Sequence, residues 1–86
     1  MRTIWKFPIG TEAETEMPKG ANALTVQNQR GVPCLWAEVD TDMPLVKRRF
    51  EIFGTGHDML PGERFYIGTF QMDSGKFVFH VYERKS

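Results

Sequence analysis

The chain has 86 residues, and its 11 basic and 11 acidic side chains cancel to a formal net charge of zero. A neutral chain is a poor fit for general nucleic-acid binding or for coating an anionic membrane, so a bound anion requires a local pocket. This length supports one domain, residues 1–86, with a core large enough to fold without metal or disulfide staples. Cys34 is the only cysteine, which excludes an intramolecular disulfide and is typical of a reducing compartment such as cytosol. We expect no signal peptide in residues 1–8 and no membrane span, which needs ~20 apolar residues.

Period-two alternation of apolar and polar residues predicts strands through most of the chain and no helix. Residues 10–19 are acidic and lack this alternation, so they predict a loop with at most a short pairing segment at 15–17. Residues 54–62 form the longest irregular stretch. The expected strands are 3–7, 22–29, 32–39, 45–53, 64–72 and 76–83. Six or seven short strands with polar turns predict an all-β fold, a small antiparallel β-sandwich or barrel.

The C-terminal hairpin is the clearest local signal. Two aromatic and β-branched runs flank residues 73–75, a three-residue loop whose glycine suits the left-handed position of a type I turn with a bulge. That loop pairs Met72 with Lys76, which places Gly68 opposite His80 and Tyr66 opposite Tyr82. The opposite, core-facing side is then formed by Ile67, Thr69, Phe77, Phe79 and Val81.

The face with Tyr66, His80 and Tyr82 has the geometry of a pocket. The glycine leaves space over its partner, the aromatic rings offer stacking to a flat ligand, and the imidazole offers a hydrogen bond. The alternative is that His80 is simply a hydrogen-bonded residue on a half-buried face.

The glycines of Gly54-Thr55-Gly56-His57 would let backbone N–H groups approach a phosphate. A phosphate-binding loop usually opens a helix and has a nearby lysine, and this segment has neither. An ordinary turn is therefore the alternative interpretation.

The densest positive cluster is Lys47-Arg48-Arg49. A strand sends Arg48 to the side opposite Lys47 and Arg49, so the cluster is either a solvated edge or, with Arg64 or Lys6 brought alongside by folding, an anion site. The acidic residues of 10–19 are a solvated loop or contact a basic protein.

Trp36 belongs to a set of polar and aromatic residues that fall opposite the presumed core, together with Gln27, Gln29, Cys34, Tyr66, His80 and Tyr82. If they share one exposed sheet, they form a surface suited to a protein or a ring-bearing ligand. The pattern leaves open whether a second layer covers Trp36 instead.

The side chains that hydrolytic enzymes need are sparse. The only serines are Ser74 in the hairpin turn and Ser86, so a serine nucleophile with a triad is not expected. The two histidines lack metal-ligand spacing and the His-x-Thr or His-x-Ser pairs of two-histidine phosphodiesterases, and we expect no metal and no cofactor. A Cys34–His80 dyad is one alternative, and a cysteine buried as a small hydrophobe is the other.

Several stretches together resemble a family of small uncharacterised proteins encoded by bacteriophages and prophages. They are Thr3–Pro8, Met17–Ala21, Gly31–Ala37, Gly54–His57, Tyr66–Gln71 and Phe77–Glu83. The resemblance brings no known activity or binding residues with it. It implies a phage accessory factor that acts in the host cytoplasm and blocks a host process, with antiviral defence as the target.

We therefore expect a non-catalytic binding protein. One form sequesters a nucleotide-derived immune signal, in pockets shared between copies of a homo-oligomer, and the other occludes a host defence protein. The neutral charge favours the second form, and the glycine loop favours the first. A small phage hydrolase of nucleotide signals and a virion component are the alternatives from other classes. The candidate ligand-binding residues are Trp36, Arg48, Gly54, Thr55, Gly56, His57, Arg64, Tyr66, His80 and Tyr82.

Overall fold

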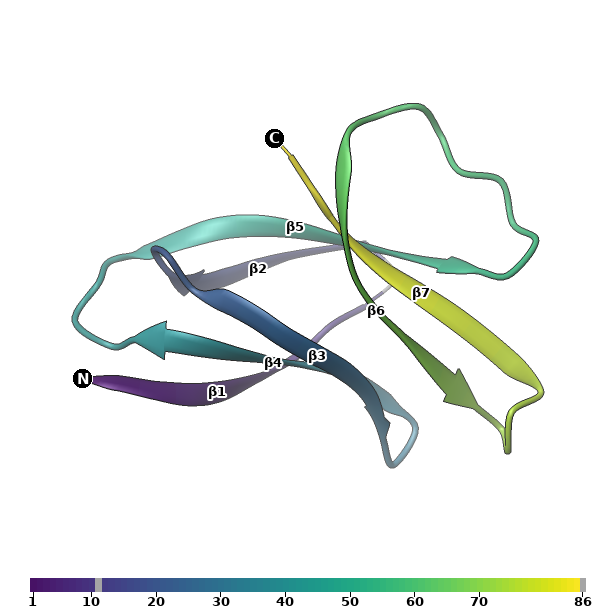
Figure 1. Ribbon diagram of the computed structural model, residues 1–86, viewed down its shortest axis with the longest axis horizontal. Coiled ribbons are helices and arrows are strands. Elements are labelled where there is room, and N and C mark those ends of the chain that lie inside the picture. The colour runs from purple at the N-terminus through teal and green to yellow at the C-terminus, as the bar shows by residue number, and fades with distance from the viewer. Residues whose placement is uncertain (11, 86) are drawn as a thin grey trace.

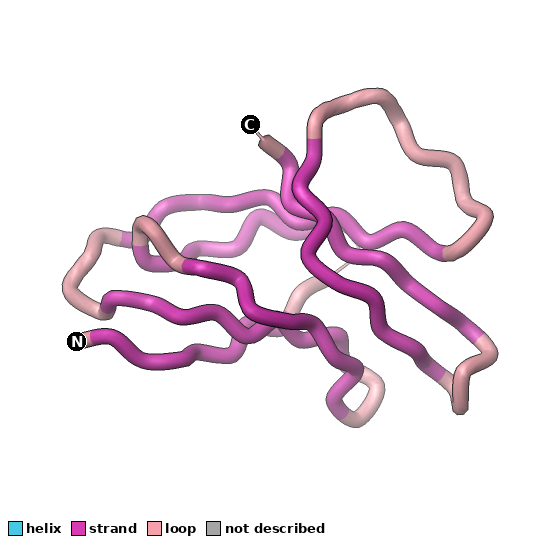
Figure 2. The backbone as a smooth tube through the Cα atoms, viewed as in Figure 1, coloured by secondary structure: helices cyan, strands magenta, loops and turns pink. Residues whose placement is uncertain are grey.

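Seven strands form two antiparallel sheets in the computed structural model, which describes residues 1–10 and 12–85 (Figures 1 and 2). The three-stranded sheet has the order β1-β4-β3, and the four-stranded sheet has the order β2-β5-β7-β6. The strands are β1 Arg2–Pro8, β2 Glu12–Pro18, β3 Asn22–Gln29, β4 Val32–Asp40, β5 Leu45–Gly54, β6 Arg64–Met72 and β7 Phe77–Arg84. The expected all-β sandwich with a C-terminal hairpin is confirmed. Residues 1–10 and 12–85 contain no helix of the length and apolar character that crossing a membrane requires.

The core lies between the two sheets and is built from alternate residues of each strand. On β4, Leu35, Ala37 and Val39 are fully buried, as the alternation predicts. The facing sheet contributes buried Phe50 and Val81. Because burial follows every second residue, the residues between them point away from the core and form the outer surfaces of the two sheets.

Residues 12–18 form a complete strand, so the expectation of a loop in this part of the chain is wrong. β2 pairs with β5 and places Glu14 opposite Arg49 and Glu16 opposite Lys47. Opposite charges across a strand pair stabilise the pairing, and Met17 is fully buried on the other side. Cross-strand charge pairing therefore takes the place of the apolar periodicity that the sequence lacks here.

The hairpin loop has four residues, 73–76, rather than the three expected. The Lys76 N–H donates to the Asp73 carbonyl at 3.1 Å. The φ angle is positive at Asp73 (53°), Ser74 (54°) and Gly75 (88°), and positive φ at Ser74 and Gly75, the two central residues, is typical of the type I′ turns that suit twisted hairpins. Met72 consequently pairs with Phe77 instead of Lys76.

The longer loop changes which residues face His80. Thr69 lies opposite His80, and Gly68 lies opposite Val81, so the expected Gly68–His80 pair and the core position of Thr69 are both wrong. A β-bulge between Tyr66 and Gly68 then shifts the register back, and Tyr66 lies opposite Tyr82 as predicted.

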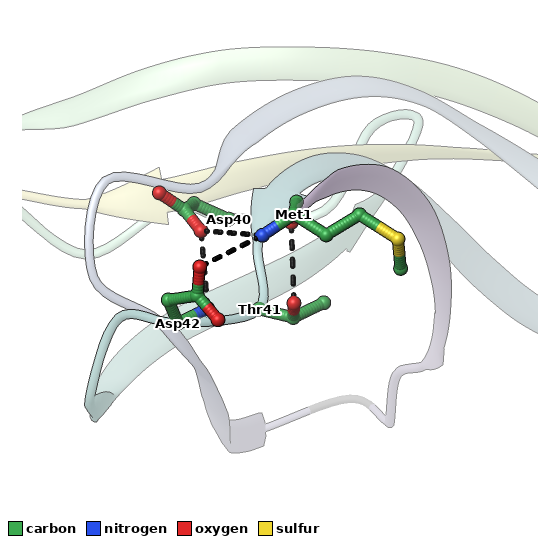
Figure 3. A network of polar contacts seen from close by, with 4 residues as sticks. All are labelled: Met1, Asp40, Thr41 and Asp42. Atoms are coloured by element: carbon green, nitrogen blue, oxygen red, sulfur yellow. Dashed lines mark hydrogen bonds and ion pairs between the residues drawn. The ribbon is translucent and has the colours of Figure 1, made fainter.

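The start of β1 is tied to the loop that follows β4 (Figure 3). The Met1 amine donates to Asp42 Oδ2 at 2.9 Å and to Asp40 Oδ1 at 3.4 Å, and the Thr41 N–H donates to the Met1 carbonyl at 2.8 Å. The hydrogen bond with Asp42 raises the pKa of the amine above its ordinary value. The backbone N–H of Asp42 lowers the pKa of the Asp40 carboxyl.

Candidate functional site

The outward side of β5, β7 and β6 gathers most of the polar and aromatic side chains that the sequence singles out. The register places Glu51 and Tyr66 on either side of Tyr82, and Phe53 and Thr69 on either side of His80. We call this surface the outer face and define it by Glu51, Phe53, Arg64, Tyr66, Thr69, His80, Tyr82 and Arg84.

Three aromatic rings occupy the middle of the outer face. The Tyr82 ring meets Phe53 edge-on with centroids 5.9 Å apart and meets Tyr66 edge-on at 5.4 Å. The Arg64 guanidinium lies over the Phe53 ring at 5.1 Å. Tyr66 is 57% exposed, so its ring is accessible to a flat ligand.

A chain of hydroxyl groups runs through His80 beside these rings. The Thr55 hydroxyl lies 2.7 Å from His80 Nε2, and the Thr69 hydroxyl lies 3.0 Å from His80 Nδ1. Tyr66 hydrogen-bonds to Thr69 at one end, and Thr55 donates to the Val78 carbonyl at the other. A neutral imidazole with its proton on Nε2 gives every one of these groups a hydrogen-bond partner. In this arrangement Tyr66 donates to Thr69, which donates to His80 Nδ1. His80 Nε2 then donates to Thr55, which donates to the Val78 carbonyl. This arrangement holds the His80 ring and the Tyr66 phenol in fixed orientations.

Arg64 and Glu51 form an ion pair next to the Phe53 ring. Arg64 Nε donates to Glu51 Oε1 at 2.7 Å, and the Arg64 side chain is only 7% exposed. Burial alone would raise the pKa of Glu51, but the hydrogen bond from Arg64 and the charges of Arg64 and Arg84 outweigh it, so the pKa lies below its ordinary value. Arg64 Nη2 is buried and has no hydrogen-bond partner among residues 1–10 and 12–85.

Loosely held cations border the same end of the outer face. Two adjoining hollows share Glu14, Arg49 and Arg84. Lys47, Lys85 and the Arg48–Glu83 ion pair also line the first hollow, which has an excess of positive charge. Arg49 approaches Glu14 only to 3.9 Å, and Arg84 approaches Glu51 only to 3.5 Å, so these guanidinium groups have donors to offer an anion.

The cations and the rings lie on the same strands. Arg84 follows Tyr82 by two residues on β7, and Arg49 precedes Glu51 by two residues on β5. Residues two apart on one side of a strand are about 6.5–7 Å apart. That spacing is comparable to the distance between the ring and the phosphate of a nucleotide.

The segment Gly54–His57 is a hydrogen-bonded turn that borders the outer face. The His57 N–H donates to the Gly54 carbonyl at 3.0 Å, and φ is positive at Gly56 (86°). The exposed His57 ring folds back over Gly54, where a Cβ would come within 2.7 Å of it. Thr55 links this turn to His80.

Two of the sequence-predicted site residues lie off the outer face, although Arg48 lines the first hollow. Arg48 is on the core side of β5, where it donates to both Glu83 carboxylate oxygens at 2.6 and 2.8 Å and to the Ala21 carbonyl at 2.6 Å. The hydrogen bond with Glu83 raises the pKa of Arg48, which keeps it charged despite burial. Trp36 is half-buried on the outward side of the other sheet, between Lys6 and Thr25.

The polar and aromatic residues outside the core therefore belong to two different sheets. Gln27, Gln29 and Cys34 share the outward side of the three-stranded sheet with Trp36. Cys34 is 2% exposed and faces away from the sheet that bears His80, so the two do not form a dyad.

Sequence reasoning missed Glu51, Phe53, Thr69 and Arg84 as members of the outer face. Alternation along the last strand carries from His80 and Tyr82 to Arg84, and alternation from Lys47 and Arg49 carries to Phe53. The strand pattern was therefore sufficient to identify Phe53 and Arg84. Thr69 was not, because its side depends on the length of the hairpin loop.

These features define a small two-sheet all-β protein with a polar and aromatic candidate binding surface on one sheet. Within the part of the chain that the structure describes, no group of three or more His, Cys, Asp or Glu side chains is placed to hold a metal ion. The chain belongs to the family described as domain of unknown function (DUF7352), whose match spans residues 1–86. It matches no curated protein and no solved structure.

Proposed function

We propose that this protein is a non-catalytic binding protein whose outer face takes a ligand with an aromatic ring and a phosphate, such as a nucleotide-derived signal. The observation that carries the proposal is that the Tyr82 ring and the loosely paired Arg84 lie two residues apart on the same side of β7. Ring stacking contributes about 1–3 kcal/mol per base and tolerates different bases. A phosphate accepts charge-assisted hydrogen bonds from Arg84 and Arg49.

The polar chain around His80 supports binding rather than turnover. Both imidazole nitrogens are engaged by threonine hydroxyls, and no carboxylate hydrogen-bonds to His80 among residues 1–10 and 12–85. A general base in a hydrolase is usually oriented by such a carboxylate. Here the threonines fix the ring, which is then suited to donate or accept a hydrogen bond at the edge of a bound base.

The biological role follows from the resemblance to phage and prophage proteins. In this proposal the protein acts in the host cytoplasm and lowers the concentration of a nucleotide immune signal, which counters antiviral defence. Affinity and copy number matter for such a role, and turnover does not.

A second candidate is occlusion of a host defence protein. The loop between β5 and β6 projects from the sandwich (Figure 1) and carries Leu60, which is 75% exposed, and Met59, which is 45% exposed. Exposed apolar side chains on a projecting loop are typical of protein-binding surfaces. Leu60 also lines one of the cationic hollows, so a protein partner would cover the same region.

Isothermal titration calorimetry with a panel of cyclic nucleotides and adenosine-ribose compounds tests the proposal. Any bound compound is then released by heat denaturation and identified by chromatography. Binding with release of the unchanged compound supports sequestration, and release of an altered compound identifies a hydrolase instead. If none of the panel binds, the nucleotide proposal fails, and a pull-down from host lysate with wild-type protein and a Leu60→Asp variant tests occlusion. Presence in purified virions would identify a structural component.

A further inference from the structure

We propose that the free edges of β1 and β2 pair with the same edges of a second copy of this chain, in a dimer with twofold symmetry. β1 is an edge of the three-stranded sheet, and β2 is an edge of the four-stranded sheet. The other two edges, β3 and β6, pack against each other. β1 and β2 therefore border the open side of the sandwich.

The core side of β1 is incompletely covered. Trp5 lies opposite Ala37, which is fully buried in the core. The Trp5 ring is nevertheless 39% exposed, and Ile4 on the other side of the strand is 58% exposed. β1 packs mainly on β4 and has little contact with the facing sheet. A large aromatic side chain on the core side of an edge strand indicates a surface that lacks its covering layer.

The two edges carry opposite charges on their outward sides. Arg2 and Lys6 lie on β1, and Glu14 and Glu16 lie on β2. Charges on an edge strand disfavour its pairing with a like strand. Pairing of β1 with β1, or of β2 with β2, places like charges together, whereas pairing of β1 with β2 places cations beside carboxylates. The charge pattern selects the mixed pairing.

A twofold axis parallel to the strands gives both edge strands, β1 and β2, a pairing partner in the second copy. β1 and β2 run in opposite directions (Figure 1), so β1 of one copy meets β2 of the other as an antiparallel neighbour. The symmetry repeats this contact on the second sheet and leaves no edge open for further growth. The Trp5 rings of the two copies then face a shared interior.

The experiment is light scattering coupled to size-exclusion chromatography across a wide range of protein concentration. The wild-type chain is expected to have a dimer mass that falls to the monomer mass on dilution. Two charge variants separate this interface from others. Arg2→Glu with Lys6→Glu makes both edges acidic. Glu14→Lys with Glu16→Lys makes both edges basic, and Lys47→Glu with Arg49→Glu is added to this variant so that the cross-strand charge pairs between β2 and β5 are kept.

Each charge variant alone is expected to be monomeric, and an equimolar mixture is expected to recover the dimer mass because opposite edges meet again. Lys76→Glu, in the exposed turn between β6 and β7, is the charge-reversal control and retains the dimer. Circular dichroism establishes that all variants are folded. A wild-type monomer at every concentration, a dimer that both variants retain, or a mixture that stays monomeric each overturns the proposal. Ligand binding is measured separately and does not enter this result.

Discussion

The Val26 side chain lies directly on the backbone of Gly68, so that a Cβ at position 68 would come 2.9 Å from Val26 Cγ2. Val26 is 1% exposed and belongs to the core cluster, so packed neighbours oppose its displacement. The close approach of β3 and β6 thus depends on the absence of a side chain at Gly68.

Gly68→Ala is expected to lower the free energy of unfolding by about 1–3 kcal/mol, because overpacking of a filled core forces side chains or strands apart. Urea denaturation followed by tryptophan fluorescence measures the change. Gly10→Ala is the matched control, since, apart from its chain neighbours, no atom of residues 1–10 and 12–85 lies within 4 Å of a Cβ there. Adding Val26→Ala to Gly68→Ala should recover part of the loss, and simple additivity of the two costs would contradict a direct contact.

The Arg48–Glu83 ion pair is expected to stabilise the fold. Glu83→Gln leaves the guanidinium with an uncompensated charge where the two side chains are only 19% and 16% exposed, and we expect a loss of about 2–3 kcal/mol in the free energy of unfolding. Replacing both partners, Arg48→Met with Glu83→Leu, should restore most of it. Arg49→Met, the exposed neighbour, should change stability by less than about 0.5 kcal/mol, and an equal loss there would contradict this role.

Glu51 is expected to make the fold sensitive to acid. Its pKa is lower in the folded chain than in the unfolded chain, so its contribution is complete above the ordinary glutamate pKa of about 4.3 and disappears as pH falls through the lower, folded pKa. Glu51→Gln should therefore melt at a lower temperature than wild type at pH 6, and the difference should shrink below about pH 4. A difference that stays constant across this range would show that Glu51 acts only through packing.

Arg84→Gln tests the cationic end of the proposed binding surface. If a ligand of the panel binds, its dissociation constant should rise about tenfold or more, because a charge-assisted hydrogen bond to phosphate is lost. The binding enthalpy that comes from stacking of the ligand ring on the aromatic side chains should be largely retained. Arg30→Gln removes one exposed guanidinium on the other sheet and should leave affinity unchanged. Equal weakening in both variants would mean that the ligand responds to overall charge instead of this site.

The contact between the Met1 amine and Asp42 is expected to give a small, pH-dependent contribution. The amine has a raised pKa, so this contribution is complete below its ordinary pKa of about 8 and is lost as pH rises through the higher folded value. Asp42→Asn should lower the melting temperature slightly at pH 6, and by less at pH 10. Asp58→Asn makes the same charge change in the loop between β5 and β6 and should have no effect at either pH.

Most strand positions were predictable because burial on one side enforces alternation. The ranges 22–29 of β3 and 64–72 of β6 agree in full, and the other four predicted strands agree to within one residue at each end. β2 was not predictable in this way, because Glu14 and Glu16 are matched by basic residues from a distant part of the chain. Local alternation contains no information on such pairing.

The candidate site was partly predictable for a physical reason. The Tyr66–Tyr82 pair is correct because two offsets cancel: the loop is one residue longer than expected, and the bulge in β6 adds one residue back. Between these two points the side of Thr69 was assigned wrongly. Trp36 and Arg48 had the right chemistry for a ligand. Trp36 lies on the other sheet, and strand patterns do not determine sheet membership. Arg48 lies on the core side of β5 because of the same alternation that turns Arg49 outward.

Because of the bulge at Ile67, β6 can lose one residue without changing which of its side chains face outward. Ile67 is the extra residue opposite β7, and the pairs on either side of it, Tyr66 with Tyr82 and Gly68 with Val81, are already in the positions of a regular ladder. A shorter chain that lacks Ile67 would keep Arg64 and Tyr66 turned outward. Deletion of one residue at this point would therefore leave the same side chains on the outer face.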